Sequence, residues 1–336
     1  MTRLRKIVMI LALAVYTVTA LSACGKDKSN TGSNSKDNNK LNVVTTIFPQ
    51  YDFLRQIGGE HLNLTMLLSP GAESHSFEPT PKDMKSIENS ALFVYVGGES
   101  DTWVEGILDG VDNSKTKIIT LMDCVTTVEE EIVEGMTEEH EHEDGEHEDG
   151  EHEDAEHEHE AEYDEHVWTS PENAKLIVKK LCDALCEADP EHAEDYKKNT
   201  KEYLASLDTL DQKFEDVVDN AKRKEIIVAD RFPFRYFVDE YGLTYYAAFP
   251  GCATDTEANA ATIAFLTDKV KNDGIPVVFH IELSNEKICE SISESTGAKS
   301  ELLNAVHNIS KSDFEAGVTY IDLMEHNVKV LKEALN

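Results

Sequence analysis

Histidine is concentrated in one short segment of this 336-residue chain, and its imidazole is a natural protein ligand for Zn²⁺ and other borderline metals. Residues 138–168 read EEHEHEDGEHEDGEHEDAEHEHEAEYDEHVW. The near-pentapeptide repeat contains His140, His142, His147, His152, His157 and His159. Carboxylates around these imidazoles raise the local cation concentration, so the repeat predicts weak metal capture. A solubilising insertion is the alternative, because the repeat has too few apolar side chains to form a core.

Two further histidines stand beside the ends of predicted elements. His75 follows a predicted strand in SPGAESHSFEPTP, and His166 leaves the acidic segment in DEHVWTSP. A single histidine in such a place is more often structural. Two of them at element ends begin to indicate the ligands of one metal site.

Alternating strands and helices must position these side chains. Before the acidic segment we expect strands at 41–47, 62–71, 91–97 and 117–121, with helices at 50–59, 81–90 and 101–108. After it we expect strands at 225–230, 244–249 and 276–282, with helices at 234–242, 259–274, 285–297 and from about Tyr320. Such alternation predicts parallel sheets with helices on their faces. Ligands of such sheets usually bind beyond the carboxyl ends of the strands.

Two helices are expected between these sets of strands. Ser170 and Pro171 offer an N-cap and a first-turn proline for a helix that reaches about Ala188. Residues 191–220 contain no proline or glycine and place apolar residues at helical spacing, which predicts a helix ~45 Å long. The predicted fold class is therefore α/β, with two lobes joined by one long rigid helix and a metal site in the cleft between them.

The expected domain boundaries follow from these elements. Residues 1–23 combine basic residues, an apolar run and small residues, which predicts a secretory signal. The ending LSAC resembles a bacterial lipobox, in which Cys24 receives lipid, and residues 24–40 then form a flexible tether. We expect an N-terminal lobe at 41–189, with a disordered acidic loop at 129–165, a linker helix at 190–221 and a C-terminal lobe at 222–336.

The charge of the chain narrows the classes of partner. The formal net charge is −35, and the acidic loop carries about half of that imbalance. Nucleic acid is therefore excluded as a partner, because its phosphates would be repelled, and cations are favoured. A secreted zinc hydrolase would need a spacing such as HExxH on a helix, which this sequence lacks. The sequence has no CxxC pair, and it assigns no role beyond packing to Cys252 or Cys289.

Several of these motifs occur together in one known family. PGAESHSFEPTP, HVWTSP, the histidine-rich loop between them, the long central helix and the ending VTYIDLMEHNVKVLKEALN resemble the metal-binding lipoproteins of bacterial zinc and manganese ABC importers. The resemblance covers nearly the whole chain after Cys24. It implies two lobes bridged by a rigid helix, a metal held between them, delivery to a membrane permease and no catalysis. It also implies that His75 and His166 are the first two metal ligands.

The third ligand position departs from the family pattern. In VADRFPFRYFVDEYG, Arg231 stands where the family has a histidine, and a guanidinium has no lone pair to offer a metal. We expect His280, at the end of PVVFHIE, and His307, in NAVHNIS, to complete the site from the second lobe. Glu282 lies two residues after His280, on the same face of the strand, and is expected either to bind the metal through an oxygen or to accept a hydrogen bond from an imidazole N–H. Arg231 is expected to pair with a carboxylate.

The predicted function is extracytoplasmic capture of Zn²⁺ and its delivery to an ABC permease and its ATPase. We expect a monomer anchored to the cell membrane by an N-terminal lipid, or a periplasmic protein. A manganese importer component, a surface zinc buffer and an adhesin are the alternatives. Histidine-dominated ligation favours Zn²⁺, whereas a carboxylate-rich site would favour Mn²⁺.

Overall fold

The computed structural model describes residues 40–72, 77–110, 114–136, 162–253 and 258–336. The predicted signal segment, the tether and Cys24 lie outside the described residues, as do His75 and the six histidines of the repeat. In the described part of the chain, no helix is both long enough and apolar enough to cross a membrane.

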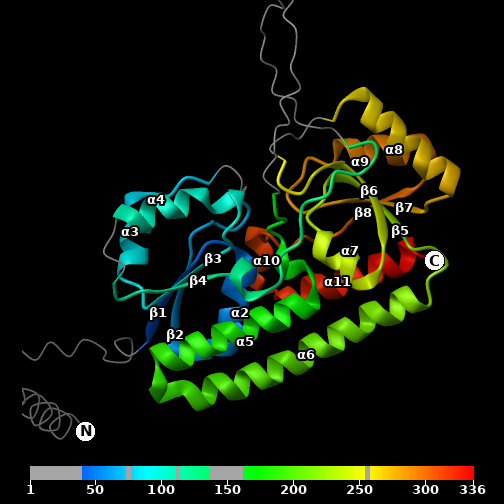
Figure 1. The fold of residues 1–336 in the computed structure, drawn as a ribbon. Coiled ribbons are helices and arrows are strands. Elements are labelled where there is room, and N and C mark those ends of the chain that lie inside the picture. Colours follow the sequence, from blue (N-terminus) through cyan, green and yellow to red (C-terminus); the bar gives the residue numbers. More distant parts are fainter. Residues whose placement is uncertain (1–39, 73–76, 111–113, 137–161, 254–257) are drawn as a thin grey trace, which may run out of the picture. The chain divides into compact units, whose positions relative to one another are not determined.

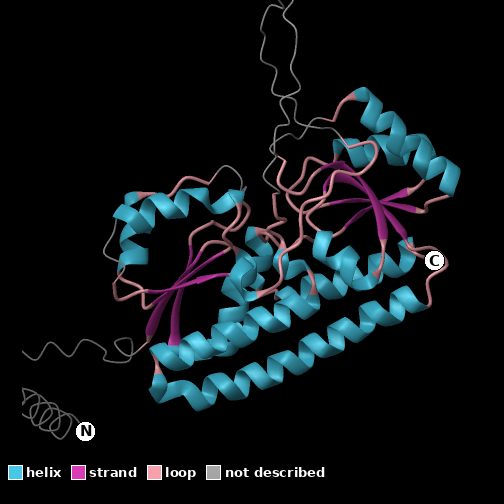
Figure 2. Cartoon of the chain, in the orientation of Figure 1, coloured by secondary structure: helices cyan, strands magenta, loops and turns pink. Residues whose placement is uncertain are grey.

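Two four-stranded parallel sheets form the frame of residues 40–336 (Figures 1 and 2). The first has the order β2-β1-β3-β4, formed by β2 (Leu62–Met66), β1 (Leu41–Thr45), β3 (Leu92–Tyr95) and β4 (Lys117–Thr120). The second has the order β6-β5-β7-β8, formed by β6 (Thr244–Phe249), β5 (Glu225–Arg231), β7 (Val277–His280) and β8 (Lys299–Leu302). The predicted α/β fold is confirmed, although the strand β8 was not expected.

Helices cover both sheets. Before the second sheet the chain forms α2 (Phe48–Gly58), α3 (Pro81–Glu88), α4 (Thr102–Gly110), α5 (Pro171–Ala188) and α6 (Ala193–Asp219). Within and after it the chain forms α7 (Arg235–Tyr241), α8 (Ala260–Asp273), α9 (Lys287–Thr296), α10 (Lys311–Ala316) and α11 (Tyr320–Ala334). The start of α5 is as predicted, because the Ser170 side chain caps the helix by accepting from the Asn173 N–H and Pro171 opens its first turn.

The long helix α6 lies along both sheets (Figure 1). Its 27 residues give a length of about 40 Å, close to the predicted length. Its buried face consists of residues at helical spacing, namely Tyr196, Tyr203, Leu207, Leu210, Phe214 and Val217. This face packs on α5, α2 and the C-terminal helix α11, so one helix contacts elements from both ends of the chain. Removing this apolar stripe from water stabilises the arrangement.

Hydrogen bonds also tie α11 to the first half of the chain. The fully buried Asp52 on α2 accepts from the backbone N–H of Tyr320, at the start of α11, and from the Arg55 guanidinium. The Tyr320 hydroxyl donates to the carbonyl oxygen of Trp168 at 2.7 Å. The C-terminal helix is therefore fixed to the elements that carry the first sheet.

The two ends of the predicted acidic loop pair with each other. Glu129 and Tyr163 form an antiparallel bridge, and the N–H of Glu130 donates to the carbonyl oxygen of Glu162. The Tyr236 hydroxyl on α7 donates to the carbonyl oxygen of Asp164. We expected a single disordered loop over 129–165, and this pairing was not predicted. It places Asp164 and the residues after it against the second half of the chain.

The buried carboxyl of Glu240 makes stability depend on pH. Burial, together with the nearby carboxylates of Asp211 and Glu172, raises the pKa of Glu240 to about 7. Because this folded pKa lies above the ordinary 4.5, the stabilising contribution is complete below about pH 4.5 and is lost as the pH rises through about 7. We expect Glu240→Gln to raise the free energy of unfolding by roughly 1–2 kcal/mol near pH 8 and to change it little near pH 5. Urea unfolding at both pH values measures this, and parallel pH profiles for the variant and the wild type would contradict it.

Candidate metal site

Loops that follow strands of both sheets converge around His166. Gly98 and Ser100 follow β3, Gly251 and Cys252 follow β6, and His307 follows β8. His166 itself lies immediately before η4 (Val167–Thr169), the 3₁₀ turn that leads into α5. The site is thus at the carboxyl ends of parallel strands, where the sequence predicted a ligand to bind.

The imidazole of His166 is fully buried, and one of its two ring nitrogens has a hydrogen-bond partner among the described residues. Its Nδ1 lies 3.1 Å from the Asp164 carboxylate, which also accepts from the His166 backbone N–H at 2.8 Å. Since an ionised carboxylate can only accept, Nδ1 carries a proton, and in the neutral imidazole Nε2 therefore keeps its lone pair. Among the residues that the structure describes, Nε2 has no hydrogen-bond partner. Burial alone would lower the pKa of His166, but the charge and hydrogen bond of Asp164 raise it above its ordinary value.

The turn that carries His166 is held on both sides. The Thr169 hydroxyl donates to the carbonyl oxygen of His166 at 2.8 Å. The indole N–H of Trp168 donates to the carbonyl oxygen of Ala305, beyond β8, also at 2.8 Å. The ring of Trp168 packs against His166, with centroids 5.5 Å apart. The position of the imidazole is therefore set by groups from both halves of the chain.

Glu165 places a second ligand-type side chain beside His166. Its carboxylate accepts from the Ser100 N–H at 3.1 Å and from the Ser100 hydroxyl. The approach depends on Gly98, because a Cβ added there would lie 2.1 Å from Oε2 of Glu165 and 2.5 Å from its Cβ. The side chain of Glu165 is buried, so its carboxylate is held at the site by the loop after β3.

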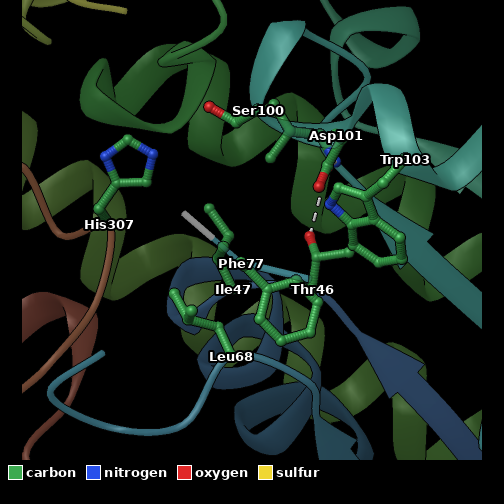
Figure 3. A pocket seen from close by; sticks show the side chains of 9 residues that line it. Thr46, Ile47, Leu68, Phe77, Ser100, Asp101, Trp103 and His307 are labelled. Atoms are coloured by element: carbon green, nitrogen blue, oxygen red, sulfur yellow. Dashed lines mark hydrogen bonds between the residues drawn. The ribbon is translucent and has the colours of Figure 1, made fainter. Parts of the chain in front are cut away.

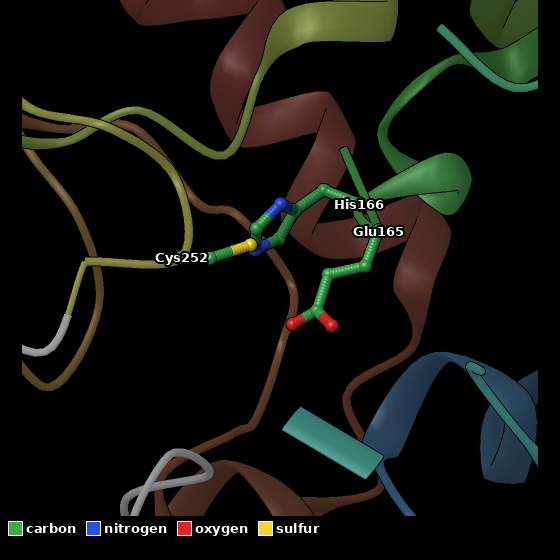
Figure 4. A group of neighbouring side chains, drawn as sticks. All are labelled: Glu165, His166 and Cys252. Carbon is green, nitrogen blue, oxygen red and sulfur yellow. The ribbon is translucent and has the colours of Figure 1, made fainter. Parts of the chain in front are cut away.

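Cys252 approaches the same point from the second sheet (Figure 4). One ligand atom from each of Glu165, His166 and Cys252 lies within 4.8 Å of the others, and this is the one such group of three in the described ranges. The Cys252 backbone N–H donates to Glu130 at 3.2 Å. Burial, and after it the charges of Glu165 and Glu130, raise the pKa of the Cys252 thiol. One imidazole, one carboxylate and one sulfur are a donor set that Zn²⁺ accepts.

His307 lies next to this group and faces a small cavity (Figure 3). Its ring meets that of His166 edge to face, with centroids 4.8 Å apart. The cavity of about 10 Å³ has room for about one water-sized particle. It is lined by Thr46, Ile47, Leu68, Phe77, Val96, Ser100, Asp101, Trp103 and His307. Residues of both halves therefore enclose it.

A buried carboxylate and a strained residue shape the turn before His307. Glu282 accepts from the backbone N–H groups of Ala305 and His307 at 2.7 and 2.8 Å. Burial raises the pKa of Glu282 to about 6, although these backbone donors oppose the shift. Val306 has a φ of 60°, which a β-branched residue rarely adopts, and strained conformations of this kind cluster at functional sites. Glu282 thus orients the loop of His307 through the backbone.

The other predicted second-half residues do not join the group of three. His280 ends β7 with its Nδ1 3.2 Å from the carbonyl oxygen of Ile281. Arg231 is buried at the end of β5, where its backbone N–H donates to Asp230. The roles of His280 as a ligand and of Arg231 as the partner of a carboxylate remain predictions.

Besides Glu165, sequence reasoning missed Cys252 as a ligand-type residue of the group of three. A signal for it is present in the sequence, because FPGC after one strand repeats the Pro-Gly pattern of SPGAESH after another. Both segments leave the carboxyl end of a parallel strand, which is where a site residue is expected.

The sequence of this chain is similar to those of known zinc-uptake proteins. The family model described as zinc-uptake complex component A, periplasmic, matches residues 43–334. The high-affinity zinc uptake system protein ZnuA of Bacillus subtilis is 34% identical over 315 residues, which cover 94% of this chain and 93% of that protein. The zinc-binding lipoprotein AdcA of Streptococcus pneumoniae is 33% identical over 323 residues, which cover 96% of this chain and 60% of AdcA. This chain therefore spans less than two thirds of AdcA.

A solved structure extends the comparison to three dimensions. The Zn(II)-bound ZnuA-like domain of Streptococcus pneumoniae AdcA superposes with a TM-score of 0.70 at 30% identity, covering 88% of this chain and 99% of that chain. The similarity thus includes both sheets and the helices between them.

Gly98 allows a steric test of the site. We expect Gly98→Ala to lower the free energy of unfolding by roughly 1–3 kcal/mol, because the new methyl group overlaps Glu165. Gly106→Ala on α4 is the matched control, since a Cβ there meets nothing within 4 Å and alanine favours a helix. Thermal unfolding of the two variants measures the difference. A Gly98→Ala protein as stable as the control would show that Glu165 is not held as the structure places it.

Proposed function

The chain belongs to the family of periplasmic zinc-uptake components, and we propose that it captures Zn²⁺ at the site around His166, beyond the carboxyl ends of the strands. Members of this family are binding components of zinc ABC uptake systems and not enzymes. Zinc is therefore cargo, which the protein must hold tightly and then release.

The observation that supports this site best is the free Nε2 of His166. A polar atom buried without a partner costs about 1–3 kcal/mol, so it is retained where a ligand satisfies it. Asp164 holds Nδ1, so the atom that the neutral His166 offers as a ligand beside Glu165 and Cys252 is Nε2. An imidazole oriented by a carboxylate is a recurrent feature of zinc sites.

We infer the further ligands of the site from the sequence and the geometry together. His75 remains the predicted partner of His166 from the loop after β2, and it lies outside the described residues. In the second half, the edge-to-face contact of His307 with His166 favours His307 over His280 as a residue of the site. Arg231 contributes no ligand atom, so the position at which the family has a histidine supplies no ligand here.

We expect zinc binding to depend on His166 and to exceed manganese binding. His166→Ala should lower the affinity for Zn²⁺ by at least about 100-fold, because the loss of one ligand also leaves the Asp164 carboxylate without its imidazole partner. His326→Ala, on α11 with its Nε2 3.1 Å from the carbonyl oxygen of Leu302, is the control and should bind like the wild type. Equilibrium competition between Zn²⁺ and Mn²⁺ with a metal indicator measures both effects. Tighter binding of Mn²⁺ would favour the manganese alternative.

Membership of this family indicates where the protein acts and which partners it has. The protein acts outside the cytoplasm with the membrane components of an ABC uptake complex. We add that lipidation of Cys24 anchors it to the membrane, that residues 24–40 act as its tether and that it works as a monomer. A surface adhesin or zinc buffer without a permease is the rival function, and zinc uptake that persists in cells lacking this protein would favour it.

The histidine repeat is proposed to collect zinc for the site. Its imidazoles and carboxylates attract the cation, and weak binding leaves it free to move on. Replacing its six histidines by serine, which keeps every carboxylate, should lower the total number of zinc ions bound and leave the tight site intact. Isothermal titration resolves the two classes of site. An unchanged zinc stoichiometry would leave the repeat with only a solubilising role.

A further inference from the structure

We propose that Cys252 binds the metal through its thiolate, as the ligand that the second sheet supplies in place of the histidine position occupied by Arg231. The inference deepens the proposed function and rests on it. It assigns a sulfur donor to a site in which the family has a histidine at the position of Arg231.

The distances suit a shared metal ion. The ligand atoms of Glu165, His166 and Cys252 lie within 4.8 Å of one another. Around tetrahedral Zn²⁺, bonds of about 2.0–2.3 Å place neighbouring ligand atoms roughly 3.3–3.8 Å apart. Side-chain movements of about 1 Å therefore close the group around an ion. In Figure 4 the sulfur of Cys252 lies beside the imidazole of His166, with the Glu165 carboxylate below them.

The backbone around Cys252 is built for this approach. A Cβ added to Gly251 would lie 3.2 Å from Cε1 of His166, 3.3 Å from Oδ2 of Asp164 and 3.0 Å from the carbonyl oxygen of Phe232. A glycine thus lets the chain pass directly against the imidazole. The hydrogen bond from the Cys252 N–H to Glu130 holds the next residue in place. The thiol reaches the site because its backbone is packed against the neighbouring ligand.

The position of Cys252 compensates for Arg231. β5 and β6 are adjacent parallel strands, and Arg231 is paired in register with Phe249. Cys252 follows Phe249 by three residues, so it leaves the same edge of the same sheet. A ligand missing at the end of β5 is therefore replaced from the neighbouring strand, and the metal still joins the two sheets.

When Zn²⁺ binds, Cys252 loses its proton and the ligands offset the charge of the ion. Binding of Zn²⁺ forms a Zn–S bond and breaks the S–H bond of Cys252, and the proton leaves to solvent. The thiolate and the Glu165 carboxylate together offset the two positive charges, while His166 binds as a neutral ligand through Nε2. Lone pairs of the Glu165 carboxylate remain available beside its bonds to Ser100. Because thiolate is a soft ligand, the site favours zinc and cadmium over manganese.

Substitution of the thiol tests the assignment on the purified protein. We expect Cys252→Ser to lower the affinity for Zn²⁺ by at least about tenfold, since a hydroxyl is a poor replacement for a thiolate. Cys289→Ser is the matched control, because Cys289 is buried in the same half, where its thiol donates to the carbonyl oxygen of Val278 and contacts Ser300. This control should bind zinc like the wild type.

Two measurements on the wild type make the test independent of the variant's folding. Co²⁺ in place of Zn²⁺ should give a thiolate-to-metal charge-transfer band in the near ultraviolet, and this band should be absent from Cys252→Ser. Bound Zn²⁺ should also slow alkylation of Cys252 by iodoacetamide at least about tenfold, as followed by peptide mass spectrometry, because a metal-bound thiolate is a weaker nucleophile.

The results for the two variants distinguish an error in the role of Cys252 from an error in the site around His166. If His166→Ala loses zinc while Cys252→Ser binds it like the wild type and Co²⁺ gives no charge-transfer band, Cys252 is not a ligand and the function stands. If neither variant changes zinc binding, the site around His166 is itself wrong. Loss of affinity in both variants, together with the charge-transfer band and protection from alkylation, supports the thiolate.

Discussion

Asp164 accepts a hydrogen bond from Nδ1 of the buried His166, and the chemistry of the site depends on this pair. The bond places the proton on Nδ1 and leaves the lone pair of Nε2 in a position with no polar partner among the described residues. In a protein interior such an atom is costly, whereas a bound cation both satisfies it and offsets the charges of Glu165 and Glu130 nearby. In the proposed metal site, this unsatisfied atom thus favours binding of the ion.

The turn that carries this pair is supported from both sheets. Tyr236 on α7 donates to the carbonyl oxygen of Asp164, while the Trp168 indole donates to Ala305 beyond β8. Behind them, α6 and α11 pack against each other and against α2, so apolar burial and the Asp52 hydrogen bonds fix the two halves of the chain. Because these supports are helices and buried hydrogen bonds, the ligand side chains can reorient around a metal while their backbone stays in place.

The sequence was sufficient for the features that local physics determines. The Ser170–Pro171 cap specified the start of α5, and the apolar spacing from Tyr203 to Val217 specified α6, because both signals depend only on neighbouring residues. The strand β8 was missed since KSEL carries two charged residues and no apolar run. His166 was predicted from its place at an element end, whereas Cys252 was not, because its proposed role depends on the packing of Gly251 against an imidazole 85 residues earlier, which no local pattern encodes. The histidines of the repeat lie outside the described residues, so the structure leaves them as predicted.

The exchange between Arg231 and Cys252 follows from the geometry of parallel sheets. Neighbouring parallel strands end at the same edge, so side chains that follow them lie in one shared region although they are far apart in sequence. The pairing of Arg231 with Phe249 means that β5 and β6 end at the same edge of the sheet. In the proposed site, an arginine at the end of β5 removes a ligand, and a cysteine after the end of β6 supplies one of different chemistry. A substitution that looks disabling in a linear alignment therefore changes which strand contributes the ligand, and the sulfur it brings shifts the preference of the site toward thiophilic metals.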